Sequence, residues 1–235
     1  MTKFLKNLYR LFLIRTPFFI ISSYIKNFLP NYKTKQKCKK IELKMYRNFK
    51  SINESEKLFC NNLNYLSNNF KNKANINHIL EIGSYEGRSA LFFLQFFSNS
   101  KITCVDTWSG SDEHLNYNFN IIEENFDKNT LSFKNNLTKY KMTSDNFFQN
   151  NSKIFDLIFI DGDHFYDQVI RDINNAWKVL KNGGFLILDD YLWWYYKDSN
   201  KNPANTINSF IMNNYSNISE FKIWHQVILK KKAKS

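Results

Sequence analysis

The sequence predicts an α/β fold: an open, mostly parallel, seven-stranded sheet with helices on both faces, a C-terminal antiparallel strand pair and an N-terminal helical extension. Three observations support this prediction. From residue 77, short apolar runs alternate with helical patterns. A glycine-containing turn joins the first run to the first helix, and several of the runs end in an acidic residue.

The expected elements follow from this alternation. Parallel strands are expected at residues 79–82, 101–106, 140–143, 155–161 and 185–189, with an antiparallel pair at 220–223 and 226–231. Helices are expected at 89–97, 118–135, 167–180 and 203–213.

Three segments are expected along the chain. Residues 1–50 form a basic, amphipathic extension, residues 51–74 a helix and linker that pack on the core, and residues 75–235 the main domain. The middle helix is predicted from a capping box, Ser51 with Glu54, followed by apolar residues at helical spacing. These residues are Phe59, Leu63, Leu66 and Phe70.

The net charge of +12 is confined to the extension. Residues 1–50 hold 13 of the 33 Lys and Arg residues but only Glu42 of the 21 acidic residues, so the remaining chain is neutral. A nucleic-acid-binding catalytic face is therefore not expected. Cys38, Cys60 and Cys104 are scattered without zinc-ligand spacing, which indicates a reducing, cytoplasmic compartment.

Residues 3–29 are both apolar and basic. Arg15 and Pro17 interrupt the apolar run, which disfavours a membrane-spanning helix and a cleaved signal peptide. Two interpretations remain. Residues 3–40 lie on an anionic membrane at its inner face, or the helix packs on the domain or on a second subunit of a homodimer.

The turn after the first strand indicates a ligand site. Glu81 ends the strand, and Gly83 and Gly87 lie between it and the next helix. Glycine permits close approach to the backbone, and the N–H groups of a helix start attract an anion. The Gly-x-x-x-Gly spacing differs from the Gly-x-Gly-x-x-Gly of dinucleotide-binding proteins, which disfavours an NAD-dependent enzyme.

Acidic residues follow four of the expected strands. Asp106, 19 residues after Gly87, is placed to accept hydrogen bonds from ribose hydroxyls. Asp161, Asp189 and Asp190 are expected at neighbouring strand ends, where oxygen ligands favour Mg²⁺. The alternative is that these acids cap helices or bind backbone amides without a metal.

Four motifs carry a resemblance to a known family: residues 81–89 (EIGSYEGRS), 105–108 (VDTW), 159–166 (FIDGDHFY) and 180–191 (LKNGGFLILDDY). They resemble class I, Rossmann-like methyltransferases that use S-adenosylmethionine, in particular the group of catechol, caffeoyl-CoA and macrolide-sugar O-methyltransferases. Asn182 replaces a proline that is common in this family, and Asp190 replaces the usual asparagine ligand.

The resemblance implies specific site residues. The methionine end of the cofactor would lie at the glycine turn, the ribose at Asp106 and the adenine near Ser144. The full implied cofactor set is Glu81, Gly83, Tyr85, Gly87, Ser89, Asp106, Trp108, Ser144 and Asp161. The implied metal ligands are Asp161, Asp189 and Asp190, with Mg²⁺ as the first expectation.

The chemistry expected is direct methyl transfer to a hydroxyl oxygen. Together with Asp161, two residues are candidates for catalysis: His164 takes the proton or orients a neighbour, and Asp163 binds the metal or the acceptor. Histidines 78, 114 and 225 are expected at loops or the surface.

The acceptor is expected to be a small molecule or a sugar hydroxyl on a glycan. Residues 191–196, YLWWYY, place aromatic rings directly after the expected metal ligands, and both sugars and planar rings stack on such surfaces. The same rings equally suit core packing or a subunit contact. A non-catalytic protein that keeps this fold and binds membrane or RNA through its basic arm is the alternative function.

Overall fold

The computed structural model describes residues 3–28, 46–52, 76–110, 118–194, 198 and 201–233. Their contacts divide the chain into two compact units, each considered by itself below. The central unit comprises residues 30–157, and the C-terminal unit comprises residues 158–235 together with residues 1–29. The predicted helix with Phe59 and Phe70, and the predicted boundary at residue 74, lie outside the described residues.

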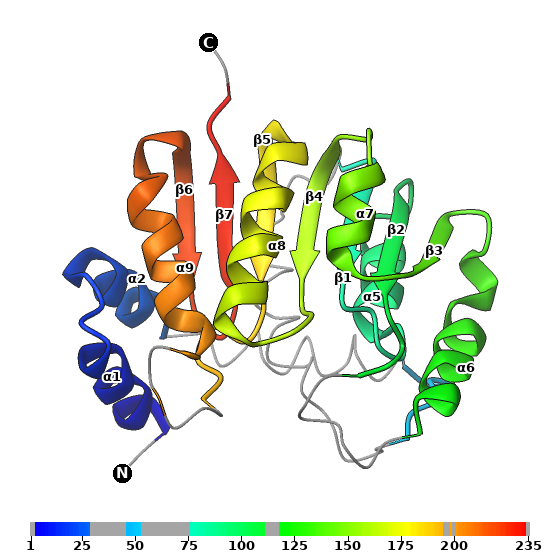
Figure 1. The fold of residues 1–235 in the computed structure, drawn as a ribbon, viewed down its shortest axis with the longest axis horizontal. Helices are drawn as coiled ribbons and strands as arrows, with labels where there is room; N and C mark the ends of the chain where they lie inside the picture. The colour runs from blue at the N-terminus through cyan, green and yellow to red at the C-terminus, as the bar shows by residue number, and fades with distance from the viewer. Residues whose placement is uncertain are drawn as a thin grey trace. The chain divides into compact units, whose positions relative to one another are not determined.

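The strands form one sheet with the order β3-β2-β1-β4-β5-β7-β6 (Figure 1). Strands β1, β2 and β3 pair in parallel, whereas β7 pairs antiparallel with both β5 and β6. The predicted fold class is therefore confirmed. The strands are β1 (His78–Ile82), β2 (Lys101–Asp106), β3 (Leu137–Lys141), β4 (Phe155–Ile160), β5 (Leu180–Leu188), β6 (Ile218–Ile223) and β7 (Val227–Lys231).

The central unit follows a strand–helix rhythm. Its helices are α5 (Arg88–Phe96), α6 (Phe119–Thr130), the 3₁₀ turn η1 (Leu131–Phe133) and α7 (Ser144–Asn150). The core strands are buried along nearly their whole length, as expected for parallel strands covered on both faces. Asp156 accepts hydrogen bonds of 3.0 Å from the backbone N–H groups of Asn77 and His78, which fixes the start of β1.

Helix α7 was not predicted. Thr143 caps it by accepting a 3.2 Å hydrogen bond from the Asn146 N–H, and Asp145 lies in the first turn. Both features are typical of a helix start. The helix has only 7 residues and buries only Phe147, so it lacks the apolar periodicity that reveals longer helices.

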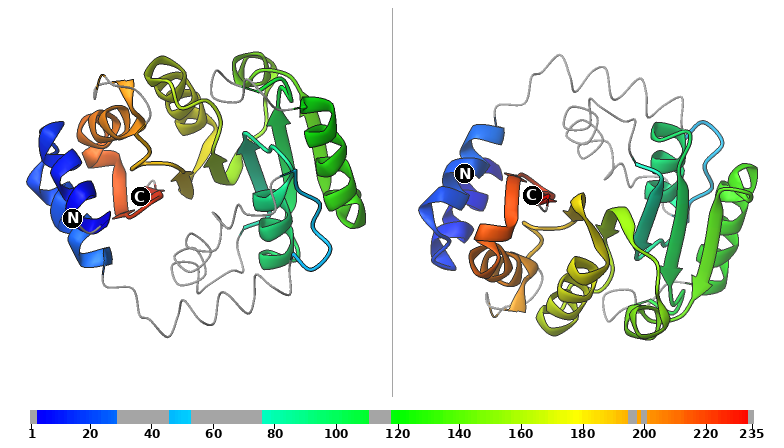
Figure 2. Two further views of the ribbon diagram at one scale, coloured as in Figure 1. Left: turned by 90° about the horizontal axis from the view of Figure 1, so that it is seen from below. Right: turned by 90° about the horizontal axis from the view of Figure 1, so that it is seen from above.

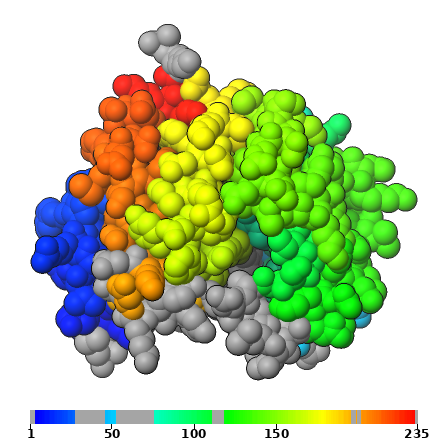
Figure 3. Space-filling view, in the orientation of Figure 1, coloured from blue at the N-terminus to red at the C-terminus, as the bar shows by residue number. Residues whose placement is uncertain are grey.

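The C-terminal unit contains α8 (Tyr166–Val179), α9 (Pro203–Asn213) and the 3₁₀ turn η3 (Tyr215–Asn217), together with β5, β6 and β7. Helices α8 and α9 pack side by side (Figure 1), and the yellow and orange side chains of this unit adjoin in the space-filling view (Figure 3). Strand β5 begins at Leu180, five residues earlier than predicted, and therefore includes Gly183 and Gly184. Gly183 has φ 80°, in the left-handed region, and a β-carbon added there would meet no atom within 4 Å, so its backbone conformation favours glycine and close packing does not.

Residues 1–29 of the N-terminal extension belong to the C-terminal unit. Helices α1 (Lys3–Leu13) and α2 (Phe18–Phe28) are separated at the predicted break, and α2 packs on β6 (Figure 2). The Tyr24 ring stacks on Trp224, with centroids 5.4 Å apart and planes 20° apart. The described part of the extension thus packs on its own chain, and its contact with a membrane stays a prediction.

The Lys231 side chain caps the C-terminal end of α8. Its ammonium group donates hydrogen bonds to the carbonyl oxygens of Trp177 (2.7 Å) and Leu180 (2.9 Å), where the helix has no further backbone donors. We expect Lys231→Met to lower the free energy of unfolding by about 1–3 kcal/mol. Chemical denaturation measures this change, with the exposed Lys232→Met as the matched control. Equal stabilities of the two variants would contradict this role.

Candidate functional site

The glycine turn of the central unit is held by one carboxylate. Asp106, at the end of β2, accepts 2.8 Å hydrogen bonds on Oδ2 from the N–H groups of both Ser84 and Tyr85. Its Oδ1 accepts a 2.7 Å hydrogen bond from the Trp108 N–H. Tyr85 and Trp108 both have positive φ angles, 46° and 47°. Asp106 therefore stabilises two backbone conformations that side chains larger than glycine rarely adopt.

Trp108 reinforces the same turn. Its Nε1 donates a 2.8 Å hydrogen bond to the Tyr85 carbonyl, and its ring lies 4.9 Å from that of Phe126. The side chain is buried. The structure thus gives Trp108 a role in shaping the turn, and its predicted contact with a cofactor stays a prediction.

Backbone conformation favours glycine at both Gly83 and Gly87, and close packing favours it at Gly87 as well. Gly83 has φ 84° and Gly87 has φ 81°, both in the left-handed region. At Gly87, a β-carbon would also lie 3.0 Å from atoms of both Phe126 and Thr130. The described neighbours of Gly87 thus lie on α6, whereas the sequence had suggested the close approach of a ligand.

Glu81 lies beneath the turn. Its side chain is fully buried, and Oε2 accepts a 2.6 Å hydrogen bond from the Ser84 hydroxyl. Burial raises the pKa of Glu81 to about 7, against the opposing effect of the Ser84 hydrogen bond. Ser89, in the first turn of α5, is also buried. Both residues therefore support the turn from inside, and their predicted contact with a cofactor stays a prediction.

The raised pKa of Glu81 predicts a pH dependence. A protonated Glu81 stabilises the fold fully below pH 4.5, and this stability is lost as the pH rises to about 7. We expect Glu81→Gln, which does not titrate, to gain about 3 kcal/mol relative to the wild type across this range. Denaturation at a series of pH values measures the difference, and parallel curves for the two proteins would show that Glu81 does not titrate this way.

Glu86 is a turn residue that sequence reasoning missed. It is buried, and its carboxylate accepts hydrogen bonds from the Ser51 hydroxyl (2.6 Å), the Ile52 N–H (2.8 Å) and the Asn125 amide (2.7 Å). It thereby ties residues 51 and 52 to the glycine turn. The available signal was an acid between two glycines at a predicted ligand turn.

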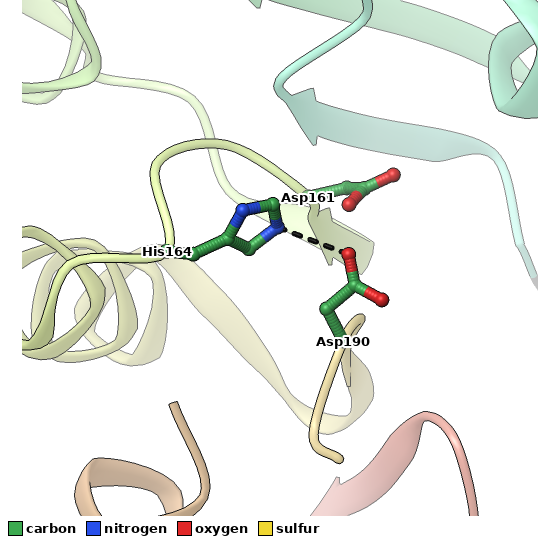
Figure 4. A group of neighbouring side chains, drawn as sticks. All are labelled: Asp161, His164 and Asp190. Atoms are coloured by element: carbon green, nitrogen blue, oxygen red, sulfur yellow. Dashed lines mark ion pairs between the residues drawn. The ribbon is translucent and has the colours of Figure 1, made fainter. Parts of the chain in front are cut away.

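A second group of residues lies in the C-terminal unit, and we call it the acid–histidine cluster: Asp161, His164 and Asp190. One ligand atom of each lies within 4.8 Å of the others. Figure 4 shows Asp161 just after β4, His164 in the following loop and Asp190 just after β5, with the three side chains converging. His164 Nε2 lies 3.0 Å from Asp190 Oδ2, an ion pair when the imidazole is protonated.

Asp189 is placed differently from its neighbour. Its Oδ2 accepts a 2.8 Å hydrogen bond from the Gln226 amide, and its Oδ1 accepts a 2.7 Å hydrogen bond from the Asp190 N–H. Burial, and then the nearby Asp190 charge, raise the pKa of Asp189 to about 7. Among the described residues, the metal-competent group contains His164 and not Asp189. The role of Asp189 as a direct ligand stays a prediction.

The comparison with protein families concerns both groups of residues. Residues 80–191 match the model of a family described as a methyltransferase domain, and this segment spans the glycine turn and the acid–histidine cluster. Over residues 80–191 the chain resembles a class I methyltransferase domain. The predicted resemblance is therefore confirmed, and S-adenosylmethionine is the cofactor of this class.

The chain also has a relative in sequence. The chain is 30% identical over 139 residues to an uncharacterized protein of Acanthamoeba polyphaga mimivirus, a match that takes 55% of this chain. The chain spans 57% of the length of that relative.

Similar solved structures show the same fold at low sequence identity. A candidate caffeoyl-CoA O-methyltransferase from Staphylococcus aureus has a TM-score of 0.57 and 16% identity, covering 84% of this chain and 100% of that one. The MycE methyltransferase of mycinamycin biosynthesis, solved with Mg and SAH, has a TM-score of 0.57 and 13% identity. That match covers 82% of this chain and 54% of MycE.

Two predicted site residues, Asp163 and Ser144, belong to neither the glycine turn nor the acid–histidine cluster. Asp163 is exposed, and its Oδ1 accepts a 2.9 Å hydrogen bond from the Phe165 N–H, so it shapes the loop before α8. The structure does not bring it into the acid–histidine cluster. Ser144 is the first residue of α7, in the central unit. His114, Tyr195 and Tyr196 lie outside the described residues.

The buried residue Tyr191 fixes the backbone next to Asp190. Asp190 has φ 50°, in the left-handed region, and the next residue, Tyr191, is completely buried. The Tyr191 hydroxyl donates a 2.7 Å hydrogen bond to Asn208, whose amide donates a 3.0 Å hydrogen bond to the Thr16 hydroxyl. Tyr191 is therefore a core residue, and of the aromatic segment it is Trp193 that stacks on His164, with ring centroids 4.8 Å apart.

Proposed function

We propose that this chain transfers a methyl group from S-adenosylmethionine to a hydroxyl oxygen of a small molecule or glycan, with the help of a divalent cation. The observation that carries the proposal is the acid–histidine cluster, which lies within the segment that matches the methyltransferase family. O-methyltransferases among the similar structures, including one from Bacillus cereus bound to SAH, support the choice of oxygen as the acceptor.

The glycine turn fits the methyl donor. No side chain caps the start of α5, so its first N–H groups suit the carboxylate of the methionine moiety. A carboxylate offers about four acceptor positions, and the turn occupies three of those on Asp106. One position remains for a ribose hydroxyl. We propose Ser144 as the adenine contact, following the resemblance.

The acid–histidine cluster fits a divalent cation. Two carboxylate oxygens favour a hard ion such as Mg²⁺, while the imidazole nitrogen also suits Mn²⁺ and other transition metals. The MycE structures contain Mg, which supports Mg²⁺ as the first candidate. When bound, such an ion would position the acceptor hydroxyl and lower its pKa.

Methyl transfer breaks the bond between sulfur and the methyl carbon, forms a bond from that carbon to the acceptor oxygen, and releases the hydroxyl proton. Two residues of the cluster suit the removal of this proton. The Asp190 carboxylate, 3.0 Å from His164 Nε2, stabilises a protonated imidazole. His164 is therefore the proton acceptor if it does not bind the metal, and a ligand if it does.

Aromatic side chains beside the cluster suit a ring-shaped acceptor. Trp193 stacks on His164, and the Arg10 guanidinium lies 5.0 Å from the centroid of the Trp194 ring. Stacked indole surfaces bind sugars and planar rings. We therefore place the acceptor next to Trp193.

A screen of hydroxyl-containing acceptors with labelled methyl donor tests the function. We expect label in a sugar or phenol only when Mg²⁺ or Mn²⁺ is present, and loss of turnover in EDTA. If turnover is undiminished in EDTA but abolished by His164→Ala, the His164–Asp190 pair activates the acceptor hydroxyl and the cation does not. Absence of donor binding would overturn the enzyme proposal and favour a non-catalytic protein.

A further inference from the structure

The α1–α2 hairpin exposes large apolar side chains on the side opposite its packing surface. On α1, Tyr9 is 61% exposed and Phe12 59% exposed, and Leu13 lies beside them. These positions share one arc of the helix, since they lie three and four residues apart. On α2, Phe18 is 79% exposed. Each helix thus presents an apolar arc outward.

The core of the hairpin is already complete without these residues. Leu11 of α1 and Ile20, Ile21 and Tyr24 of α2 are almost fully buried within the C-terminal unit. Packing therefore accounts for the inward arcs, whereas the apolar side chains of the outward arcs remain more than half exposed. Clustered exposed apolar groups of this kind mark an interaction surface.

The charge of the hairpin indicates the kind of partner. Residues 3–28 contain five basic residues and no acidic residue, and the first acid of the chain is Glu42. Lys6, Arg15 and Lys26 are exposed. Like-charged hairpins of two copies would repel one another, which disfavours a dimer, and the apolar arcs are unsuited to nucleic acid. An anionic lipid surface satisfies both features.

We propose that the α1–α2 hairpin binds the surface of an anionic lipid bilayer, with Tyr9, Phe12 and Phe18 entering the headgroup region and the basic side chains contacting lipid phosphates. Aromatic residues favour this interface. None of the described helices is long and apolar enough to cross a bilayer, so the contact is peripheral. The proposal is independent of the methyl-transfer function.

Co-sedimentation of the full chain with vesicles tests the proposal. We expect binding to phosphatidylcholine vesicles that contain about one third phosphatidylserine, and much weaker binding to phosphatidylcholine alone. Replacing Phe12 and Phe18 with serine should weaken binding about tenfold or more. The matched control replaces Leu131 and Ile154, exposed apolar residues of the central unit, with serine and should bind like the wild type.

Several results would overturn the proposal. These are the absence of binding to the anionic vesicles, equal binding by the hairpin variant and its control, or a dimer in sedimentation velocity that the hairpin variant abolishes. The last result would identify the hairpin as a subunit interface. Thermal unfolding verifies that each variant is folded. Binding of S-adenosylmethionine, measured in parallel, separates failure of this proposal from failure of the proposed function.

Discussion

Asp106→Asn is expected to weaken S-adenosylmethionine binding by about 30-fold, or about 2 kcal/mol. The carboxylate accepts three backbone hydrogen bonds that hold Ser84, Tyr85 and Trp108 in place. An amide has one oxygen and one NH₂ group. At least one of these backbone N–H groups would therefore face the NH₂ group, which cannot accept a hydrogen bond. The turn would then lose the conformation that S-adenosylmethionine requires.

Titration calorimetry measures this loss, and near-UV circular dichroism verifies that the variant is folded. The matched control is Asp127→Asn, since Asp127 is an exposed acid of the same unit that pairs with Lys139. A folded Asp106→Asn protein with wild-type affinity for the donor would contradict the role assigned to Asp106.

Asp190→Asn is expected to lower turnover about 100-fold or more while leaving the affinity for S-adenosylmethionine within about threefold of wild type. The substitution removes a charged ligand from the acid–histidine cluster and the anionic partner of His164. The glycine turn, where we place the donor, belongs to the central unit and is unchanged in sequence in this variant. The two measurements therefore separate catalysis from donor binding.

Two controls make the Asp190 result specific. Asp167→Asn changes an exposed acid in the first turn of α8 and should retain wild-type turnover. Asp163→Asn tests the residue that the sequence suggested and the structure places outside the cluster. A larger loss in Asp163→Asn than in Asp190→Asn would contradict the cluster as described.

Most of the fold could be predicted because its strands have a strong signature. Strand β4 is buried at every position and contains a nearly continuous apolar run, and β2 and α9 have the predicted bounds. Boundaries were less certain where the pattern is weak. Strand β3 is only partly buried and begins three residues before its prediction, because Leu137–Lys141 includes two lysines and a threonine.

The candidate site was predicted in part. Sequence spacing identified the strand ends that carry acids, but it could not determine which oxygen points to which partner. Gln226, 37 residues beyond Asp189, occupies one Asp189 oxygen, whereas His164 joins Asp190. Both facts depend on how β5, β7 and the loop before α8 pack, and no local pattern encodes them.

The direction in which the extension packs was also beyond the sequence. The α1 pattern predicted an amphipathic helix, but either arc could have faced the core. The structure buries Asn7 and Leu11 and exposes Tyr9 and Phe12, and the Asn7 amide donates a 3.4 Å hydrogen bond to the Tyr24 hydroxyl. A polar residue thus faces inward because it finds a partner on α2.

Calorimetric titration of the wild-type chain with S-adenosylmethionine, S-adenosylhomocysteine and NAD tests the central claim most directly. The glycine turn and Asp106 predict one site per chain for each of the two sulfur-containing nucleosides, and no saturable binding of NAD. Saturable binding of NAD, or no heat with either nucleoside, would contradict the assignment of the turn as a methyl-donor site.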